Sequence, residues 1–277
     1  MRYIFGLLVS GLIAVIGAAT LRACDVPVFR YALERWPPDR YIVYVLYDKA
    51  LSGDDAAAFK MLQNAASSSG EGPNITVVTA DVSAGVPKEL QPLWETAKEH
   101  TPPCILLRFP EAVRLDRAIW SGALNIANVR KLLDSPIRRG ISERIIAGDA
   151  AVWVLVESGN RALDNAAADS LKAALDSMKN NPLPVQIGKN LANPEKELSF
   201  TFPVVRLTRG NAAEQLLESI LMRLEPDLEE YVQYPMAIPV FGRGRALYAL
   251  VGKGINYRTV IETCHFMIEG CSCEVKA

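Results

Sequence analysis

The chain has 277 residues, 50% of them hydrophobic, so it can bury a sizeable core and is not expected to be disordered. Its 30 lysine and arginine residues almost balance 31 aspartate and glutamate residues, which gives a formal net charge of -1. This balance provides no basic surface for a polyanion and argues against nucleic acid as a partner.

The N-terminus carries an uncharged apolar run, residues 3–19, after Met1 and Arg2. A short positive start followed by an apolar stretch is typical of a secretory signal peptide or a membrane anchor, and we assign residues 1–23 to one of these. The end of this segment resembles the cleavage motif of bacterial lipoproteins at Leu21, Ala23 and Cys24, while Arg22 departs from it. Cys24 is therefore a candidate for lipidation, with plain cleavage near Ala23 or an uncleaved anchor as alternatives.

All three alternatives place the body of the protein in the bacterial cell envelope, membrane-anchored on the periplasmic or extracytoplasmic face. Such a compartment is oxidising, so cysteines there can pair. Residues 24–39 then form a juxtamembrane segment with a short amphipathic turn that Pro37 and Pro38 end. This turn either packs on a domain or lies near the bilayer, where Trp and Tyr are favoured.

Residues 40–136 show a strand, helix and strand followed by a second helix, two strands and a last helix. Ser52 and Asp55 predict a capping box for the first helix, and Asn125 predicts an N-cap for the last. The expected strands are 41–47, 74–82, 101–109 and 118–124, and the expected helices are 54–66, 88–99 and 125–136. Residues 137–148 are expected to connect this unit to the next.

The same order of elements begins again in residues 149–277. Asn211 and Glu214 predict a capping box, and Asn256 predicts the cap of the last helix. The expected strands are 150–157, 198–207, 235–241 and 246–252, and the expected helices are 165–180, 212–224 and 256–270. Because Pro103 and Pro235 precede equivalent hairpins, an internal duplication is the economical explanation.

This α/β order resembles the thioredoxin fold, and we predict two tandem thioredoxin-like (βαβ plus ββα) domains at 40–136 and 149–277. The resemblance implies a cis-proline at Pro103 and at Pro235. It also implies a Cys-x-x-Cys motif at the first helix of each domain, but "YDKALSGDDAA" and "ESGNRALDNAAAD" contain no cysteine. Ordinary thioredoxin activity is therefore not expected, and both domains are degenerate in this respect.

A second resemblance rests on "VPVFRYALERW", "PVFGRGRAL" and "CSC", which are similar to stretches of a family of bacterial envelope proteins and lipoproteins of unassigned activity. This resemblance implies a location in the bacterial cell envelope but does not imply an activity. Cys104, which follows Pro103, with His100 nearby, is a weak candidate for thiol chemistry; a half-buried strand cysteine and a loop histidine are the simpler interpretation.

The densest cluster of candidate ligands is C-terminal and comprises Cys264, His265, Cys271 and Cys273. Thiolate and imidazole suit copper or zinc, and Cys-x-Cys is a spacing used for both. Helical phase places Cys264 on the apolar face, in the core, and His265 elsewhere. A structural disulfide, packed free thiols, and metal or redox chemistry at Cys271 and Cys273 all remain open.

From these features we predict an exported, membrane-anchored, non-catalytic binding or scaffolding protein with no cofactor and with another envelope protein as partner. The alternative is a thiol-exchange or metal-handling protein, with copper or zinc, that uses Cys271 and Cys273. No paired acid and base are found that would indicate a catalytic site.

Overall fold

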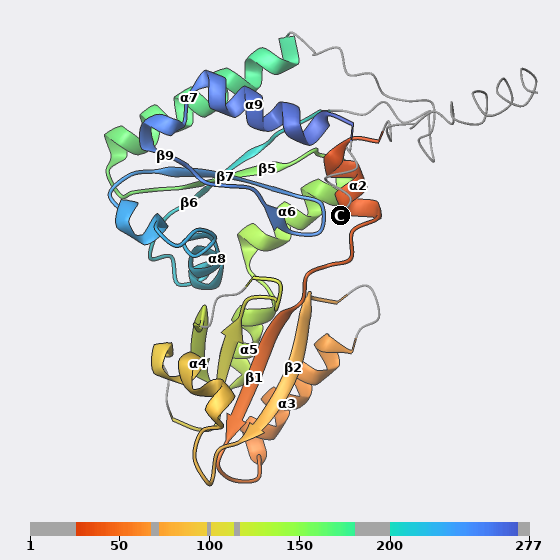
Figure 1. Ribbon diagram of the computed structural model, residues 1–277, viewed down its shortest axis with the longest axis vertical. Coiled ribbons are helices and arrows are strands. Elements are labelled where there is room, and N and C mark those ends of the chain that lie inside the picture. Colours follow the sequence, from red (N-terminus) through yellow and green to blue (C-terminus); the bar gives the residue numbers. More distant parts are fainter. Residues whose placement is uncertain (1–25, 68–71, 99–100, 114–116, 181–199, 271–277) are drawn as a thin grey trace, which may run out of the picture.

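Two β-sheets, each flanked by helices, form the part of the chain that the structure describes (Figure 1). The computed structural model describes residues 26–67, 72–98, 101–113, 117–180 and 200–270. The predicted α/β class is confirmed in this coarse sense, since helices and strands alternate along both units.

The first sheet has the strand order β2-β1-β3-β4. Its strands are β1 (Tyr41–Tyr47), β2 (Ile75–Asp81), β3 (Cys104–Arg108) and β4 (Trp120–Ala123). β1 runs parallel to β2 and antiparallel to β3, and β3 runs antiparallel to β4. β1 and β3 are central and buried on both faces, which explains why their sequences are almost continuously apolar.

Helices cover both faces of the first sheet. On one face, α3 (Gly53–Ala66) and α5 (Ile126–Leu133) pack through Leu62 and Val129 against Val43 and Leu107. On the other face, η1 (Lys88–Leu90) and α4 (Gln91–Thr96) cover Leu106 and its neighbours. The result is a three-layer unit with two apolar clusters separated by the sheet.

The second sheet repeats the order, as β6-β5-β7-β8, with β9 also paired to β7. The strands are β5 (Val152–Val156), β6 (Val204–Leu207), β7 (Met236–Phe241), β8 (Arg245–Ala246) and β9 (Leu250–Val251). β5 is parallel to β6 and antiparallel to β7. The sheet therefore has the same pairing directions as the first one, with its last strand broken into β8 and β9.

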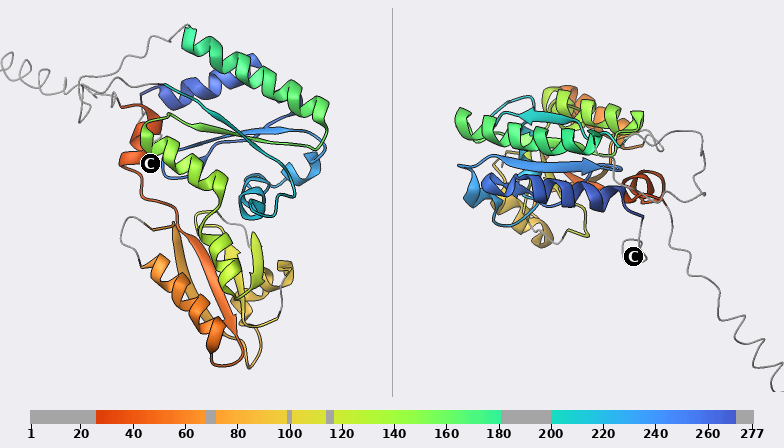
Figure 2. Two further views of the ribbon diagram at one scale, coloured as in Figure 1. Left: turned by 180° about the vertical axis from the view of Figure 1, so that it is seen from behind. Right: turned by 90° about the horizontal axis from the view of Figure 1, so that it is seen from above.

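Helices lie on both sides of the second sheet (Figure 2). Alternate residues of β5 belong to the apolar clusters on its two faces, as the alternation of a strand requires. Trp153 and Leu155 face α7 (Arg161–Asn180) and α9 (Tyr257–Ile268). Val154 faces the layer of α6 (Pro136–Ala147) and α8 (Gln215–Leu221). Two short turns, η2 (Leu228–Tyr231) and η3 (Gly252–Gly254), complete the unit.

The N-terminal helix α2 (Val28–Glu34) belongs to the core of the second unit, although it precedes the first unit in sequence. The backbone N–H of Val28 donates to the carbonyl of Glu269 at 3.0 Å, and Phe29 and Ala32 are buried. Of the two alternatives for the segment 24–39, packing on a domain is the one found. The predicted anchor 1–23 lies outside the described residues, and no helix within the described ranges has the length and hydropathy to cross a membrane.

Residues 137–148, expected as a connector, form most of helix α6 and pack on the second sheet. Pro136 occupies the first turn, where its missing N–H costs nothing, and Ile141 and Ile145 lie one turn apart and are buried. The segment thus follows the last helix of the first unit, as expected, and its apolar pair at helical spacing makes it a packed helix.

The helix caps agree with the sequence at two positions and differ at two. Asn125 accepts from the N–H of Asn128, and Asn256 forms a capping box with Thr259. Ser52 makes no side-chain capping bond, so the predicted capping box of α3 is wrong. Helix α8 begins at Gln215, and the carboxylate of Glu214 serves another helix, so that capping box is wrong as well.

Glu214 joins the two units through a buried hydrogen-bond network. Glu214 is 1% exposed, and its carboxylate accepts from the Ser135 hydroxyl at 2.6 Å and from the Ile137 backbone N–H at 2.8 Å. The second bond caps the N-terminus of α6, where a negative group is favoured. Arg138 donates to Ser135 and to the Leu132 carbonyl, and its burial lowers its pKa.

Candidate functional site

The structure separates the predicted C-terminal ligands. Cys264 is fully buried in α9, within the cluster that contains Trp153, whereas His265 is half-buried, with its Nδ1 4.0 Å from the Glu269 carboxylate. Cys271 and Cys273 lie outside the described residues, as does Cys24. Within the described ranges, no group of three or more His, Cys, Asp or Glu side chains has an arrangement that would hold a metal ion.

Burial raises the pKa of the Cys264 thiol to about 12, and the nearby Trp153 side chain offsets a smaller part of this shift. A thiol reacts as its thiolate, so such a pKa makes Cys264 unreactive at neutral pH. Cys104 is likewise fully buried, at the start of β3. The two described cysteines are therefore core residues rather than chemical groups exposed to a substrate.

The two prolines that precede equivalent strands differ in their peptide bonds. The Pro102–Pro103 bond is cis, and it is the only cis bond in the described part of the chain, so the bond before Pro235 is not cis. The expectation for Pro235 is therefore not met. Pro103 stands directly before Cys104, and Pro235 directly before Met236, each at the entry to a central strand.

The N-terminus of α7, where the thioredoxin resemblance would put a redox cysteine, is closed by its own side chains. Asp164, 3% exposed, accepts from the backbone N–H and the hydroxyl of Ser158, both at 2.7 Å. Asn160 accepts from the N–H groups of Ala162 and Leu163. Asn160 thus satisfies two of the free N–H groups of the first turn, and Asp164 ties down the loop that precedes the helix.

A charged pocket at the junction of the two units is the strongest candidate for a binding site. It has a volume of about 430 Å³ and is lined by Lys98 from the first unit and by residues of the β6–α8 segment and η2 from the second. Its charged lining residues are the basic Lys98, Arg209 and Arg223 and the acidic Glu218 and Glu229, and Arg223 and Glu229 lie within 3.3 Å of each other.

Ion pairs and backbone bonds fix the walls of the junction pocket. Glu229 lies between Arg117 of the first unit, at 3.4 Å, and Arg223 of the second, at 3.3 Å. Arg209 donates to the carbonyls of Val232 and Tyr234, and its partial burial lowers its pKa. The pocket is therefore held in shape by groups from both units.

The chemistry of the junction pocket is recognition by polar groups. Its lining contains guanidinium, ammonium, carboxylate, amide and hydroxyl groups and no cysteine or histidine. The Nε atoms of the lining residues Arg209 and Arg223 are buried without a hydrogen-bond partner among the described residues. Such donors favour acceptor oxygens of a bound polar group.

The junction pocket was missed in the sequence because its lining comes from residues between 98 and 232, and no local motif marks it. Comparison with models of known protein families gives no match, and no curated protein matches the chain.

Proposed function

We propose that the chain is an exported, membrane-anchored and non-catalytic binding or scaffolding protein, built on two thioredoxin-like domains without redox cysteines. The domain assignment is supported by the shared strand order, in which the third strand runs antiparallel to the first in both sheets. It is also supported by the layers of helices on both faces.

One observation carries the non-catalytic part of the proposal. The helices that follow β1 and β5 begin without a cysteine, and the described thiols Cys104 and Cys264 are buried in the core. A thioredoxin-type exchange needs an exposed thiolate at that helix end. The fold is then a frame that holds a binding surface.

We assign the binding role to the junction pocket, with a polar segment of another envelope protein as partner. Because the walls come from both units, the pocket exists only when the units keep their relative position. This favours a scaffold in which both domains present one surface.

Photo-cross-linking of the full chain in its native envelope tests this assignment. A photoreactive residue at Gln215, which is exposed and lines the pocket, should give a defined adduct, and Lys98→Glu, a change in the pocket's lining from the first unit, should lower its yield. The matched control is the same probe at Lys172, whose side chain is 74% exposed on α7. Equal adducts at both positions, or no adduct at Gln215, would contradict the proposed binding site.

The anchor is tested by mass spectrometry of the mature N-terminus. A diacylated or triacylated Cys24 is the expected result. A chain starting at Met1, or at an unmodified Cys24, would remove the lipoprotein part of the proposal.

Thiol counting with and without reductant, together with metal analysis, tests the alternative at Cys271 and Cys273. Inert and metal-free cysteines would exclude thiol exchange and metal handling. A fully reduced protein with tightly bound copper or zinc would instead favour the metal-handling alternative and contradict the binding or scaffolding proposal.

A further inference from the structure

The outer edge of β2 carries backbone groups that no described strand pairs with. β2 is the edge strand of the first sheet and bonds only to β1. The N–H of Tyr41 donates to the Asn74 carbonyl, and the N–H of Val82 donates to the Tyr47 carbonyl, both at 2.8 Å. Even-numbered residues therefore point their backbone groups toward β1.

Because successive residues of a strand alternate, Val77 and Thr79 point their N–H and C=O groups away from the sheet. The Ile75 carbonyl points the same way, while its N–H already donates to Pro73. A row of free donors and acceptors on an edge strand is a template for another strand.

From Ile75 to Ala80, β2 contains none of the charges or prolines that normally protect an edge. Val78 of this strand is 39% exposed. The equivalent edge strand of the second unit, β6, is shorter and carries Arg206, which bonds to Glu157. Protection by an inserted charge is therefore present on one edge and missing on the other.

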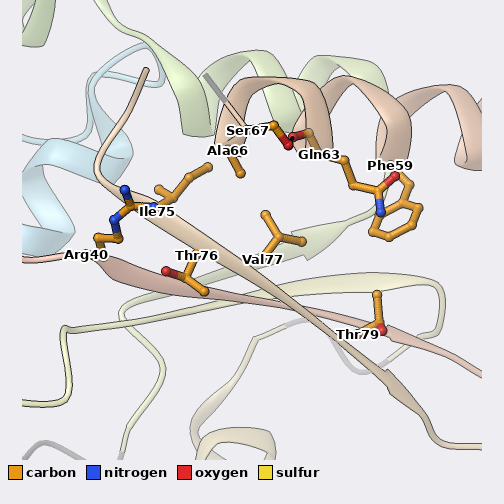
Figure 3. Close-up of a pocket in the computed structure, with 9 residues that line it drawn as sticks. All are labelled: Arg40, Phe59, Gln63, Ala66, Ser67, Ile75, Thr76, Val77 and Thr79. Atoms are coloured by element: carbon orange, nitrogen blue, oxygen red, sulfur yellow. Dashed lines mark hydrogen bonds between the residues drawn. The ribbon is translucent and has the colours of Figure 1, made fainter. Parts of the chain in front are cut away.

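A pocket of about 340 Å³ runs beside this edge, between β2 and α3 (Figure 3). Val77 and Thr79 of β2 and Phe59 of α3 line it, and Arg40 lies at the end where β2 begins. A strand added to β2 would place its side chains over this hollow.

The two ends of β2 have opposite charges. Arg40 lies beside Ile75 at one end, and Asp81 ends the strand. Neither makes an ion pair with another described residue, and the Asp81 carboxylate accepts only from Ser83. If β2 of a second copy of this chain ran antiparallel beside β2, Arg40 of each copy would lie near Asp81 of the other.

We propose that β2 pairs with β2 of a second copy of this chain, antiparallel and with the two-fold axis at Val78. In this register Val77 faces Thr79 of the second copy, and the two exchange their N–H···O=C bonds. Asp81 faces Ile75 of the second copy, on the same face of the sheet, next to Arg40. Two four-stranded sheets thus become one continuous sheet across the dimer. The inference does not depend on the proposed function.

Cysteine cross-linking of the full chain tests the register. The background variant replaces three cysteines, as Cys24→Ser, Cys271→Ser and Cys273→Ser. Cys104 and Cys264 are kept, because both are buried. Residues that face each other at a non-hydrogen-bonded position have Cα atoms about 4.5 Å apart, so Val78→Cys should form a disulfide-linked dimer on mild oxidation.

Thr76→Cys is the matched control. Two such cysteines would be separated by four residues along the strands, roughly 13 Å, which is too far for a disulfide. Thr76→Cys should therefore cross-link at least tenfold less than Val78→Cys, whereas a mixture of Thr76→Cys and Ala80→Cys chains should cross-link as a heterodimer. Equal cross-linking of Val78→Cys and Thr76→Cys, or none in either, would overturn the proposal.

Charge reversal tests the same interface without new cysteines. Arg40→Asp and Asp81→Arg, each alone, should weaken dimerisation by roughly tenfold, because two ion pairs become two like-charge contacts, and the double variant should restore it. Dimer mass is measured by light scattering of the full chain in detergent. A monomer at all concentrations, or a dimer that neither single variant weakens, would overturn the proposal; a monomer would point instead to another segment or protein on this edge.

Discussion

Replacing Glu214 is the most direct test of how the two units are joined. The residue is 1% exposed, and its carboxylate accepts hydrogen bonds at 2.6 Å from Ser135 and at 2.8 Å from Ile137. Hydrogen bonds to a charged acceptor contribute about 1.5–3 kcal/mol each, and the desolvation of the carboxylate offsets part of that. We therefore expect Glu214→Ala to lower the free energy of unfolding by about 3 kcal/mol, since it also leaves buried donors without an acceptor.

Glu214→Gln keeps the shape of the side chain and separates charge from packing. The amide retains one acceptor oxygen but turns an NH₂ group toward a donor, so a loss of about 1.5 kcal/mol is expected. In a double-mutant cycle with Ser135→Ala, the coupling energy should reach about 1 kcal/mol, because the two side chains bond directly. Both values come from urea unfolding of the full chain, followed by circular dichroism and tryptophan fluorescence.

Glu262→Gln provides the control for a carboxylate that is not buried. Glu262 forms an exposed pair with Arg258 at 2.8 Å, and its loss should cost no more than about 0.5 kcal/mol. If Glu214→Gln were as mild as Glu262→Gln, the buried network would not be what stabilises the junction, and the reasoning would be refuted.

Three further predictions concern single positions and are measured by urea unfolding. Gly242→Ala should lower the free energy of unfolding by about 2–3 kcal/mol, because φ is +57° and the new Cβ would lie 2.7 Å from a side chain of α2. Gly140→Ala, in the open interior of α6, should raise it by about 0.5 kcal/mol. Equal effects of the two substitutions would refute this prediction. Asn256→Ala should lower the free energy of unfolding by about 1 kcal/mol and Ser52→Ala should leave it almost unchanged, because of the two only Asn256 makes a side-chain capping bond. A comparable loss of stability in Ser52→Ala would contradict the observed caps. Burial raises the pKa of Cys264 from 9.0 to about 12, so the thiol loses its proton at a lower pH in the unfolded chain than in the folded one. The stability that the buried thiol contributes is therefore complete below pH 9 and is lost as the pH rises toward 12. Between pH 8 and pH 10.5 the wild type should therefore lose about 2 kcal/mol more than Cys264→Ala, and parallel curves would show that the thiol is not shielded.

The strands were predictable because their signal is local. Short runs of β-branched and aliphatic residues, such as 41–47 and 150–157, lie in β1 and β5, and the repeated order of elements foretold two similar sheets. Helical phase likewise predicted that Cys264 faces the core, where it is found. In each case the deciding information lies within a few neighbouring residues.

The errors arise where a distant partner competes for a local group. The spacing of Asn211 and Glu214 fits a capping box, yet the Glu214 carboxylate caps α6, whose first turn begins at Pro136, far away in sequence. Similarly, α6 was expected only as a connector, and for α2 both packing on a domain and a place near the bilayer stayed open, because their apolar stripes are short. Both are buried only because the second sheet offers a matching face. The junction pocket likewise forms only when segments far apart in sequence come together, so no local sequence motif marks it.

The two sheets have the same topology but differ in the sequence of their edge strands. Strand order and pairing directions are the same, so the core requires no difference between β2 and β6. Yet β6 places Arg206 in the strand, where it bonds to Glu157 and Asn165, and β2 keeps six uncharged residues from Ile75 to Ala80. An unprotected edge of this kind is a liability for a monomer unless something covers it. The difference between the two edges is therefore better explained by an interaction at β2 than by folding.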